Sequence, residues 1–196
     1  MEKYIYISIP KTGTNSVHEI MGQTKYNHIT ANTIKTVIGE NEYNSKESFC
    51  FIRNPVDLVK SWYYYHKYNP RVPKDEGALY YPDTIDKWVF DMNCKTHWEE
   101  NKHTQNNKLW DVGMSPLHQC NWIKDVNDNI IVNEIYRFDD LNKVLEYKFS
   151  KKVKTSNKSN KDLFELSTEV ENAIKNNFHE DIELYEKICP FIPNLE

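Results

Sequence analysis

Residues 10–16 have the composition of an anion-binding loop. They read Pro-Lys-Thr-Gly-Thr-Asn-Ser and stand between a predicted strand and a predicted helix. Such a junction directs unpaired backbone N–H groups and the positive end of a helix dipole at one point. An ordinary polar turn would share this pattern, and the spacing is not that of a Walker A loop. The lysine, hydroxyl and glycine content nevertheless suits phosphate or sulfate. The candidate binding residues are Lys11, Thr12, Gly13, Thr14, Asn15 and Ser16.

A second strand-turn-helix junction carries an arginine. Arg53 follows the apolar run Phe-Cys-Phe-Ile and precedes Asn-Pro, which places it at the carboxyl end of a predicted strand. Open α/β sheets bind ligands at that end of their strands. Ser61 follows eight residues later, about two turns into the next helix. A guanidinium offers a planar fork for phosphate. The alternative is a solvated arginine at a helix start, but the two junctions together predict one ligand with two separated anionic groups.

The elements that must position these residues alternate between strand and helix. Alternation of this kind predicts an α/β fold with a central, mostly parallel sheet flanked by helices. We find no internal repeat and no linker, so we expect a single domain over residues 1–196, with a variable insertion at about 69–115 that binds the acceptor. Strands are predicted at 4–9, 48–52 and 130–138, and helices at 15–22, 30–38, 56–67, 84–94, 141–149 and 168–186.

Composition narrows the class of protein. The chain has 196 residues, and its aromatic content of 13% is too high for a disordered chain. A net charge of -4 argues against nucleic acid as a partner. Without an apolar run of membrane-spanning length or a signal peptide pattern, we expect no transmembrane segment and a cytoplasmic location. The four cysteines are widely spaced, which predicts reduced, buried thiols and no metal site.

The two strand-turn-helix motifs, taken in their order along the chain, resemble the carbohydrate-type branch of the sulfotransferases that use 3′-phosphoadenosine-5′-phosphosulfate (PAPS). The resemblance rests first on Pro-Lys-Thr-Gly-Thr, on Arg-Asn-Pro and on the serine eight residues after the arginine. Residues 131–141 resemble that branch's strand and its Arg-Phe-Glu-Asp/Asn-Leu turn. Residues 156–159 resemble its cofactor-covering loop, and residues 178–185 resemble its last helix. The resemblance is weakest over 69–115.

The resemblance implies a P-loop-like, three-layer fold and transfer of a sulfuryl group from PAPS to a hydroxyl or amine of a carbohydrate-like acceptor. Residues 11–16 would hold the 5′-phosphosulfate, and Arg53 and Ser61 would hold the 3′-phosphate. The product would be 3′-phosphoadenosine-5′-phosphate (PAP), and no metal is required. Lys11 would stabilise the bridging or leaving oxygen in a loose, in-line transition state. The covering loop would contribute Ser156, Lys158 and Ser159.

A general base would help an acceptor hydroxyl react, and histidine has a suitable pKa of about 6.5. His28 is the favoured candidate because it lies between the two motifs, 25 residues before Arg53. Its alternative role is structural. His118 is the second candidate, as base or as an acceptor contact, and Glu19 is a minor one. We expect His18 to pack or to lie at the surface, His179 to be exposed, His66 to line the acceptor cleft, and His97 and His103 to be solvated.

Two further expectations concern the acceptor and the competing functions. Five aromatic residues follow Arg53, and one helix cannot bury all of them on one face, so some could stack on a sugar. Arg137 is expected to be structural. A nucleotide kinase or NTPase-like enzyme and a non-catalytic nucleotide- or glycan-binding module remain as alternative functions. The aromatic residues are Trp62, Tyr63, Tyr64, Tyr65 and Tyr68.

Overall fold

Three short parallel strands form a sheet in the part of the chain that the structure describes. The computed structural model describes residues 3–22, 24–68, 84–91, 117–153 and 165–193 of the chain. The strands are β1 (Tyr4–Tyr6), β2 (Glu47–Ile52) and β3 (Glu134–Arg137), in the order β1-β2-β3. Ile5 lies opposite Ser48, and Cys50 lies opposite Ile135. Because the pairing is parallel, the carboxyl ends of all three strands meet at one edge, as the sequence predicted.

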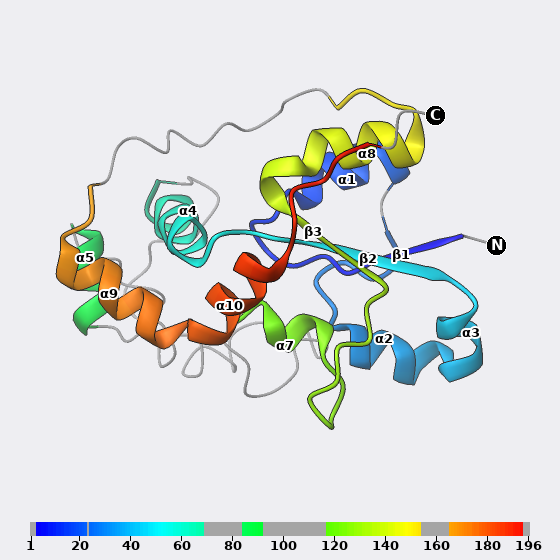
Figure 1. The fold of residues 1–196 in the computed structure, drawn as a ribbon, viewed down its shortest axis with the longest axis horizontal. Coiled ribbons are helices and arrows are strands. Elements are labelled where there is room, and N and C mark those ends of the chain that lie inside the picture. The colour runs from blue at the N-terminus through cyan, green and yellow to red at the C-terminus, as the bar shows by residue number, and fades with distance from the viewer. Residues whose placement is uncertain (1–2, 23, 69–83, 92–116, 154–164, 194–196) are drawn as a thin grey trace.

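Helices cover both faces of the sheet (Figure 1). Alternate residues of the strands point to opposite faces, so Phe49 and Phe51 pack under α1 (Thr14–Met21) and α8 (Leu141–Phe149). Cys50 and Ile52 pack on the other face. The helices of that face are α2 (Ala31–Ile38), α3 (Glu40–Asn44), α7 (Cys120–Ile123) and α10 (His179–Lys187). The arrangement is compatible with a three-layer α/β fold.

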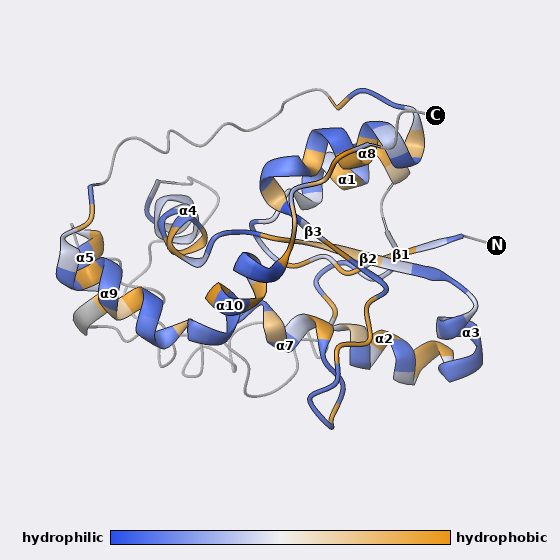
Figure 2. Cartoon of the chain, in the orientation of Figure 1, coloured by the Kyte–Doolittle hydropathy of each residue, from blue (hydrophilic) through white to orange (hydrophobic). Residues whose placement is uncertain are grey.

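A second group of helices lies beyond the carboxyl edge of the sheet (Figure 1). It consists of α4 (Pro55–Tyr68), α5 (Ile85–Asp91) and α9 (Thr168–Asn177), which bury Tyr63, Trp88 and Ile174 between them. Figure 2 shows hydrophilic and hydrophobic stretches alternating along α1, α2, α8 and α9, as expected of helices with one buried side. No helix in the described ranges is both long and apolar enough to cross a lipid bilayer.

Several predicted element boundaries were wrong. The helix predicted over 168–186 is divided at Phe178, whose backbone leaves the helical region (φ -114°, ψ 33°) while its ring is buried. β1 and β3 are shorter than predicted, although the N–H of Ile7 still bonds to Phe49 O at 2.9 Å. The short helices α3 and α7 were not predicted. A 3₁₀ turn, η2 (Phe138–Asp140), joins β3 to α8.

The cysteines were predicted as reduced, buried thiols. Cys50 and Cys120 are free and buried, which agrees with the prediction. Cys189 is free but exposed, so the prediction was wrong there, because the segment after α10 runs along the surface. Cys94 lies outside the described residues.

Candidate anion-binding site

The loop after β1 turns sharply into α1. Lys11 (φ 66°) and Gly13 (φ 91°) both have the left-handed backbone conformation. The Thr12 hydroxyl donates to Ile9 O at 2.8 Å and holds the turn together. Gly13 is the N-cap of α1 and supplies no side-chain cap, and the first turn of the helix has no acidic residue. The N–H of Ser16 bonds back to Gly13 O at 2.9 Å, whereas the described residues supply no such partner for the N–H groups of Thr14 and Asn15. Free N–H groups at a helix start are compatible with the predicted anion site, which stays a prediction.

Gly13 is required by its surroundings as well as by its conformation. A Cβ atom there would lie 2.9 Å from Leu141 Cδ2 and 3.0 Å from Phe138 Cε2. Both neighbours belong to the segment that follows β3. The loop after β1 thus packs directly against the start of α8.

Arg53 leaves the end of β2 and lies against the same loop. Its side chain is buried, with the residue only 5% exposed, and Nη1 donates to Lys11 O at 3.2 Å. The guanidinium carbon lies 5.0 Å from the centroid of the Phe138 ring. Nε is buried and has no hydrogen-bond partner in the part of the chain that the structure describes. The structure therefore brings together the two motifs that the sequence placed 42 residues apart.

Lys11 places a second cation beside Arg53. Its Nζ lies 4.0 Å from the ring centroid of Tyr65 on α4. Burial, with a smaller contribution from the charge of Arg53, lowers the pKa of Lys11 to about 8. Burial also lowers the pKa of Arg53, which the charges of Asp57 and Asp139 partly oppose.

Neither cation forms an ion pair with a carboxylate among the described residues. Two neighbouring cations that are removed from water destabilise each other, because burial and like charge both disfavour the charged forms. Anionic groups bound beside these cations would relieve both effects. The electrostatics of the site therefore favour an anionic ligand.

The remaining predicted residues take different positions. Ser61 is buried on α4, one turn from Tyr65 and so on the same side of the helix, but it makes no described hydrogen bond to Arg53. The Thr14 hydroxyl lies 3.1 Å from Ser8 Oγ. Ser16 is buried and Asn15 is exposed. Because the hydroxyl proton of Thr12 is used within the loop, an anion contact from Thr12 would come from its backbone N–H.

His28 is connected to the loop through Ser8. Its Nδ1 lies 2.8 Å from Ser8 O, and a carbonyl oxygen can only accept, so Nδ1 carries the proton and Nε2 is the basic nitrogen of the neutral ring. Ser8 Oγ also contacts Thr14. Burial lowers the pKa of His28, with the charge of His18 adding to this and the Ser8 hydrogen bond opposing it. The neutral, proton-accepting form is therefore favoured.

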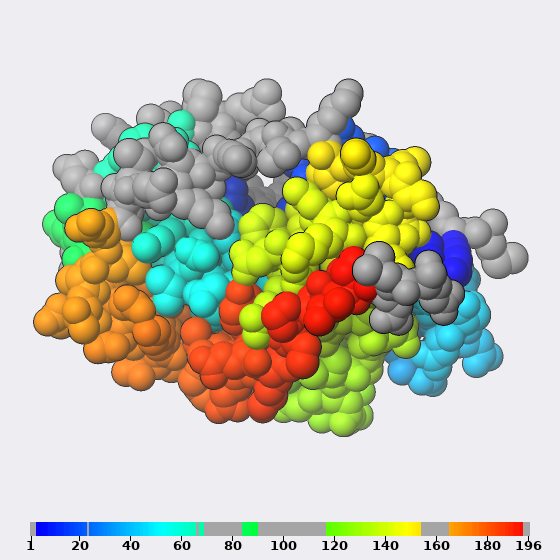
Figure 3. All heavy atoms as spheres, turned by 45° about the horizontal axis from the view of Figure 1, so that its top comes forward, coloured from blue at the N-terminus to red at the C-terminus, as the bar shows by residue number. Residues whose placement is uncertain are grey.

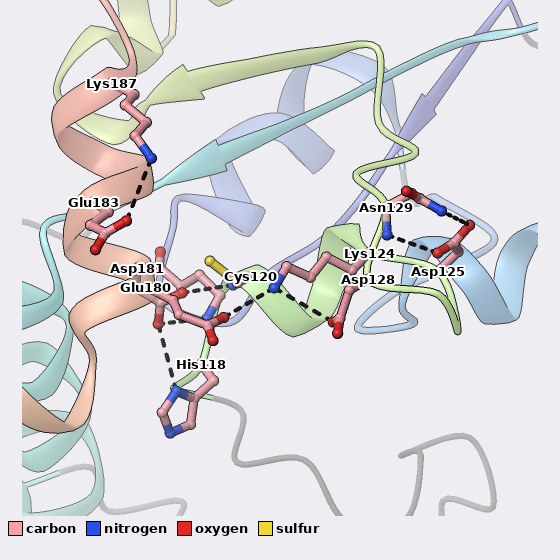
Figure 4. A network of polar contacts seen from close by, with 11 residues as sticks. His118, Cys120, Lys124, Asp125, Asp128, Asn129, Glu180, Asp181, Glu183 and Lys187 are labelled. Atoms are coloured by element: carbon pink, nitrogen blue, oxygen red, sulfur yellow. Dashed lines mark hydrogen bonds and ion pairs between the residues drawn. The ribbon is translucent and has the colours of Figure 1, made fainter.

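His118 lies directly before α7, close to Asp181 of α10 (Figure 4). Its Nδ1 is 3.9 Å from Asp181 Oδ2, and its ring centroid is 4.5 Å from that of Phe178. Its neighbour Gln119, and not His118 itself, contacts Arg53. The structure thus connects His28 to the loop after β1 through Ser8 and places His118 against α10.

The other histidines and Arg137 have simpler surroundings. His18 Nε2 lies 2.9 Å from Thr24 Oγ1, and its ring contacts Tyr6 edge-on, as expected of a packing residue. His179 is exposed, as predicted. Arg137 Nη2 donates to Glu186 O at 3.3 Å, which agrees with the predicted structural role.

Part of the predicted site lies outside the described residues. This holds for Ser156, Lys158 and Ser159, for His97 and His103, for the side chain of His66, and for most of the insertion at 69–115. In Figure 3, dark blue atoms of the N-terminal part of the chain are visible in a hollow between the cyan atoms of α4 and the yellow-green atoms of α8.

The described residues contain no cluster of three or more histidine, cysteine or acidic side chains that could hold a metal ion. Metal-free chemistry stays a prediction.

Sequence reasoning missed two residues that shape this site. Phe138 contacts both Gly13 and Arg53, and Gln119 bonds to the backbone of Arg53. Phe138 stands within the Arg-Phe-Asp-Asp-Leu turn that the sequence analysis noted, but no local pattern marks Gln119.

Comparison with known proteins finds no matching family model, no matching curated protein and no matching solved structure.

Proposed function

We propose that this protein is a PAPS-dependent sulfotransferase on a P-loop-like α/β fold, acting on a carbohydrate-like acceptor. The observation that carries the proposal is the contact between Lys11 and Arg53 at the tips of adjacent strands, without an ion-paired carboxylate among the described residues. A donor with a phosphosulfate at one end and a 3′-phosphate at the other supplies anionic groups for both junctions. The resemblance in motif order supports the same donor.

The two junctions would hold opposite ends of this donor. The uncapped start of α1 and Lys11 would bind the 5′-phosphosulfate, as helix N-termini bind anions in general. Arg53 would bind the 3′-phosphate through guanidinium N–H groups. Its buried Nε has no hydrogen-bond partner among the described residues and is a donor suited to that role. Ser61 would add a hydroxyl from α4.

The transfer would follow an in-line path. The acceptor oxygen forms a new S–O bond while the bond from sulfur to the bridging phosphate oxygen breaks, and PAP leaves. The acceptor proton passes to a general base, for which His28 Nε2 is the better supported candidate because His28 is joined to the loop through Ser8. Lys11 would stabilise the charge that develops on the leaving oxygen, an effect for which one positioned donor is worth about 10²–10³ in rate.

The binding half of the proposal is tested by thermal shift and calorimetry. PAP should stabilise the protein and bind more tightly than 5′-AMP, and Arg53→Ala should weaken PAP binding by roughly 10–100-fold, because charged hydrogen bonds are worth about 1.5–3 kcal/mol. Arg137→Ala is the matched control, since Arg137 also lies over an aromatic ring and donates to a backbone carbonyl. Equal loss of PAP and 5′-AMP binding in Arg53→Ala contradicts the assignment.

Transfer itself is tested with radiolabelled PAPS and a panel of glycans. Label on a glycan supports an enzyme, whereas tight PAP binding without transfer to any acceptor supports a binding module. Stabilisation by ATP with Mg²⁺ but not by PAP supports the kinase or NTPase-like alternative.

A further inference from the structure

The side chain of Gln119 pairs with both backbone groups of Arg53. The N–H of Arg53 donates to Gln119 Oε1 at 2.8 Å, and Gln119 Nε2 donates to Arg53 O at 2.7 Å. β2 ends at Ile52, which is the last residue of β2 in register with β3. The amide of Gln119 therefore continues the strand-like pairing for one further residue, and Gln119 is fully buried while doing so.

Gln119 is itself held by Asp181. Asp181 Oδ2 accepts the N–H of Gln119 at 3.0 Å, and Oδ1 accepts the N–H of Cys120 at 2.7 Å (Figure 4). These N–H groups stand at the start of α7, which has no side-chain cap of its own from Gln119. Asp181 comes from the first turn of α10 and is 1% exposed. A buried acidic side chain thus fixes the turn that carries Gln119.

We propose that Gln119, held by Asp181, is a positioning residue that sets the backbone of Arg53 for binding the 3′-phosphate; this inference rests on the proposed function. The guanidinium contacts Lys11 O and the Phe138 ring, so a shift of the Arg53 backbone would move it relative to both. Through Arg53, Gln119 controls recognition of the 3′-phosphate, which is the group that distinguishes PAP from 5′-AMP.

Asn133 provides a comparison at the opposite end of the same strand. Its Oδ1 accepts the N–H of Ser48 at 2.8 Å and the Ser48 hydroxyl at 2.7 Å. This is also an amide side chain that pairs with the backbone of β2, but it stands at the amino end, away from Arg53. Changes at both residues remove support from β2, and only the change at Gln119 should alter recognition of the 3′-phosphate.

The test measures the affinities of PAP and 5′-AMP for the full chain, Gln119→Met and Asn133→Ala, with circular dichroism melting to verify folding. We expect Gln119→Met to weaken PAP binding about tenfold and 5′-AMP binding less than about twofold. Asn133→Ala should leave the ratio of the two affinities unchanged. An unchanged ratio in folded Gln119→Met overturns the inference. Should Gln119→Met not fold, Asp181→Asn takes its place, because it keeps the shape and one of the two acceptors.

A second readout separates this inference from the proposed function. The rate of phenylglyoxal modification at each arginine, measured by mass spectrometry, needs no nucleotide. If Gln119 positions Arg53, modification of Arg53 is faster in Gln119→Met or Asp181→Asn, and modification of Arg137 is unchanged. An unchanged rate at Arg53 overturns the inference even if PAP binds. A faster rate at Arg53, with no preference of the unaltered protein for PAP over 5′-AMP, supports the positioning and contradicts the donor.

Discussion

The two ends of the sheet differ in whether a buried lysine is paired with a carboxylate. At the amino end, the Lys148 side chain is 7% exposed, forms an ion pair with Glu134, and lies within about 6 Å of the rings of Tyr4, Phe49 and Tyr136. At the carboxyl end, Lys11 contacts one ring and faces Arg53, and neither of them has an ion-paired carboxylate in the described part of the chain.

The difference agrees with our proposal that the ligand binds at the carboxyl end of the sheet. A lysine that contributes only to stability is compensated within the protein, as Lys148 is. Two buried cations without an ion-paired carboxylate, one of them only partly offset by the charges of Asp57 and Asp139, make the empty site less stable than it could be. Such a cost is typical of functional sites. The carboxyl end of a parallel sheet is also where α/β proteins bind their ligands.

The largest expected effect comes from replacing the two lysines by methionine. Lys11→Met should lower transfer by about 10²–10³-fold and raise the melting temperature of the empty protein by on the order of 5 °C, because it removes an uncompensated cation. Lys148→Met should lower the melting temperature and leave transfer unchanged, because Glu134 loses its partner. Melting curves and the transfer assay measure both effects. The comparison fails if both variants shift the melting temperature in the same direction.

The melting difference between the unaltered protein and Lys11→Met should also depend on pH. The folded-state pKa of Lys11 is lowered to about 8, below its ordinary value of 10.5. Between these pH values the unfolded chain binds more protons at Lys11 than the folded one, so this residue makes the unaltered protein gain stability as pH rises. The advantage of Lys11→Met should therefore shrink from pH 8 to pH 10.

Gly13→Ala should have the next largest effect. The new Cβ would meet Leu141 and Phe138 at about 3 Å in a left-handed backbone, so the loop must move away from α8. A displacement of about 1 Å at a reacting centre can cost about 10²-fold in rate. Gly22→Ala is the control, since Gly22 also has a positive φ (81°) but has nothing within 4 Å of its added Cβ. The transfer assay measures the loss. An equal loss of transfer in Gly13→Ala and Gly22→Ala would show that backbone strain alone, and not the contact of the loop with α8, is responsible.

The smallest expected effect is on the pH dependence of kcat/KM. This dependence reports the pKa values of the catalytic acid and base in the free protein. Activity should rise with pH as His28 loses its proton, at a pKa below its ordinary 6.5, and should fall as Lys11 loses its proton at about 8. Each limb changes the rate by at most about tenfold per pH unit. His28→Ala should remove the acidic limb and leave PAP affinity nearly intact. Retention of that limb in His28→Ala, with its loss in His118→Ala, would move the base to His118.

Local patterns in the sequence predicted much of what surrounds the site. The helices predicted at 15–22 and 30–38 correspond to α1 (Thr14–Met21), which ends before Gly22, and to α2 (Ala31–Ile38), which begins after its N-cap Thr30. These features depend on residues within one or two turns of each other, so they are visible without knowledge of the fold. The division of the 168–186 helix was not visible, because the ring of Phe178 packs against residues of α4 and α5 that lie far away in the sequence.

The sequence by itself determined the chemistry available at the site: a loop with Lys11 and Gly13 after one strand and an arginine after the next, each at a junction that can bind an anion. Only the tertiary structure decided that these junctions touch, that Tyr65 lies over Lys11, and that Gln119 holds the backbone of Arg53. The physical reason is that a side-chain type and a turn are properties of neighbouring residues. The burial that shifts the pKa of Lys11, and the contacts that orient Arg53, arise when segments 42 to 66 residues apart pack together.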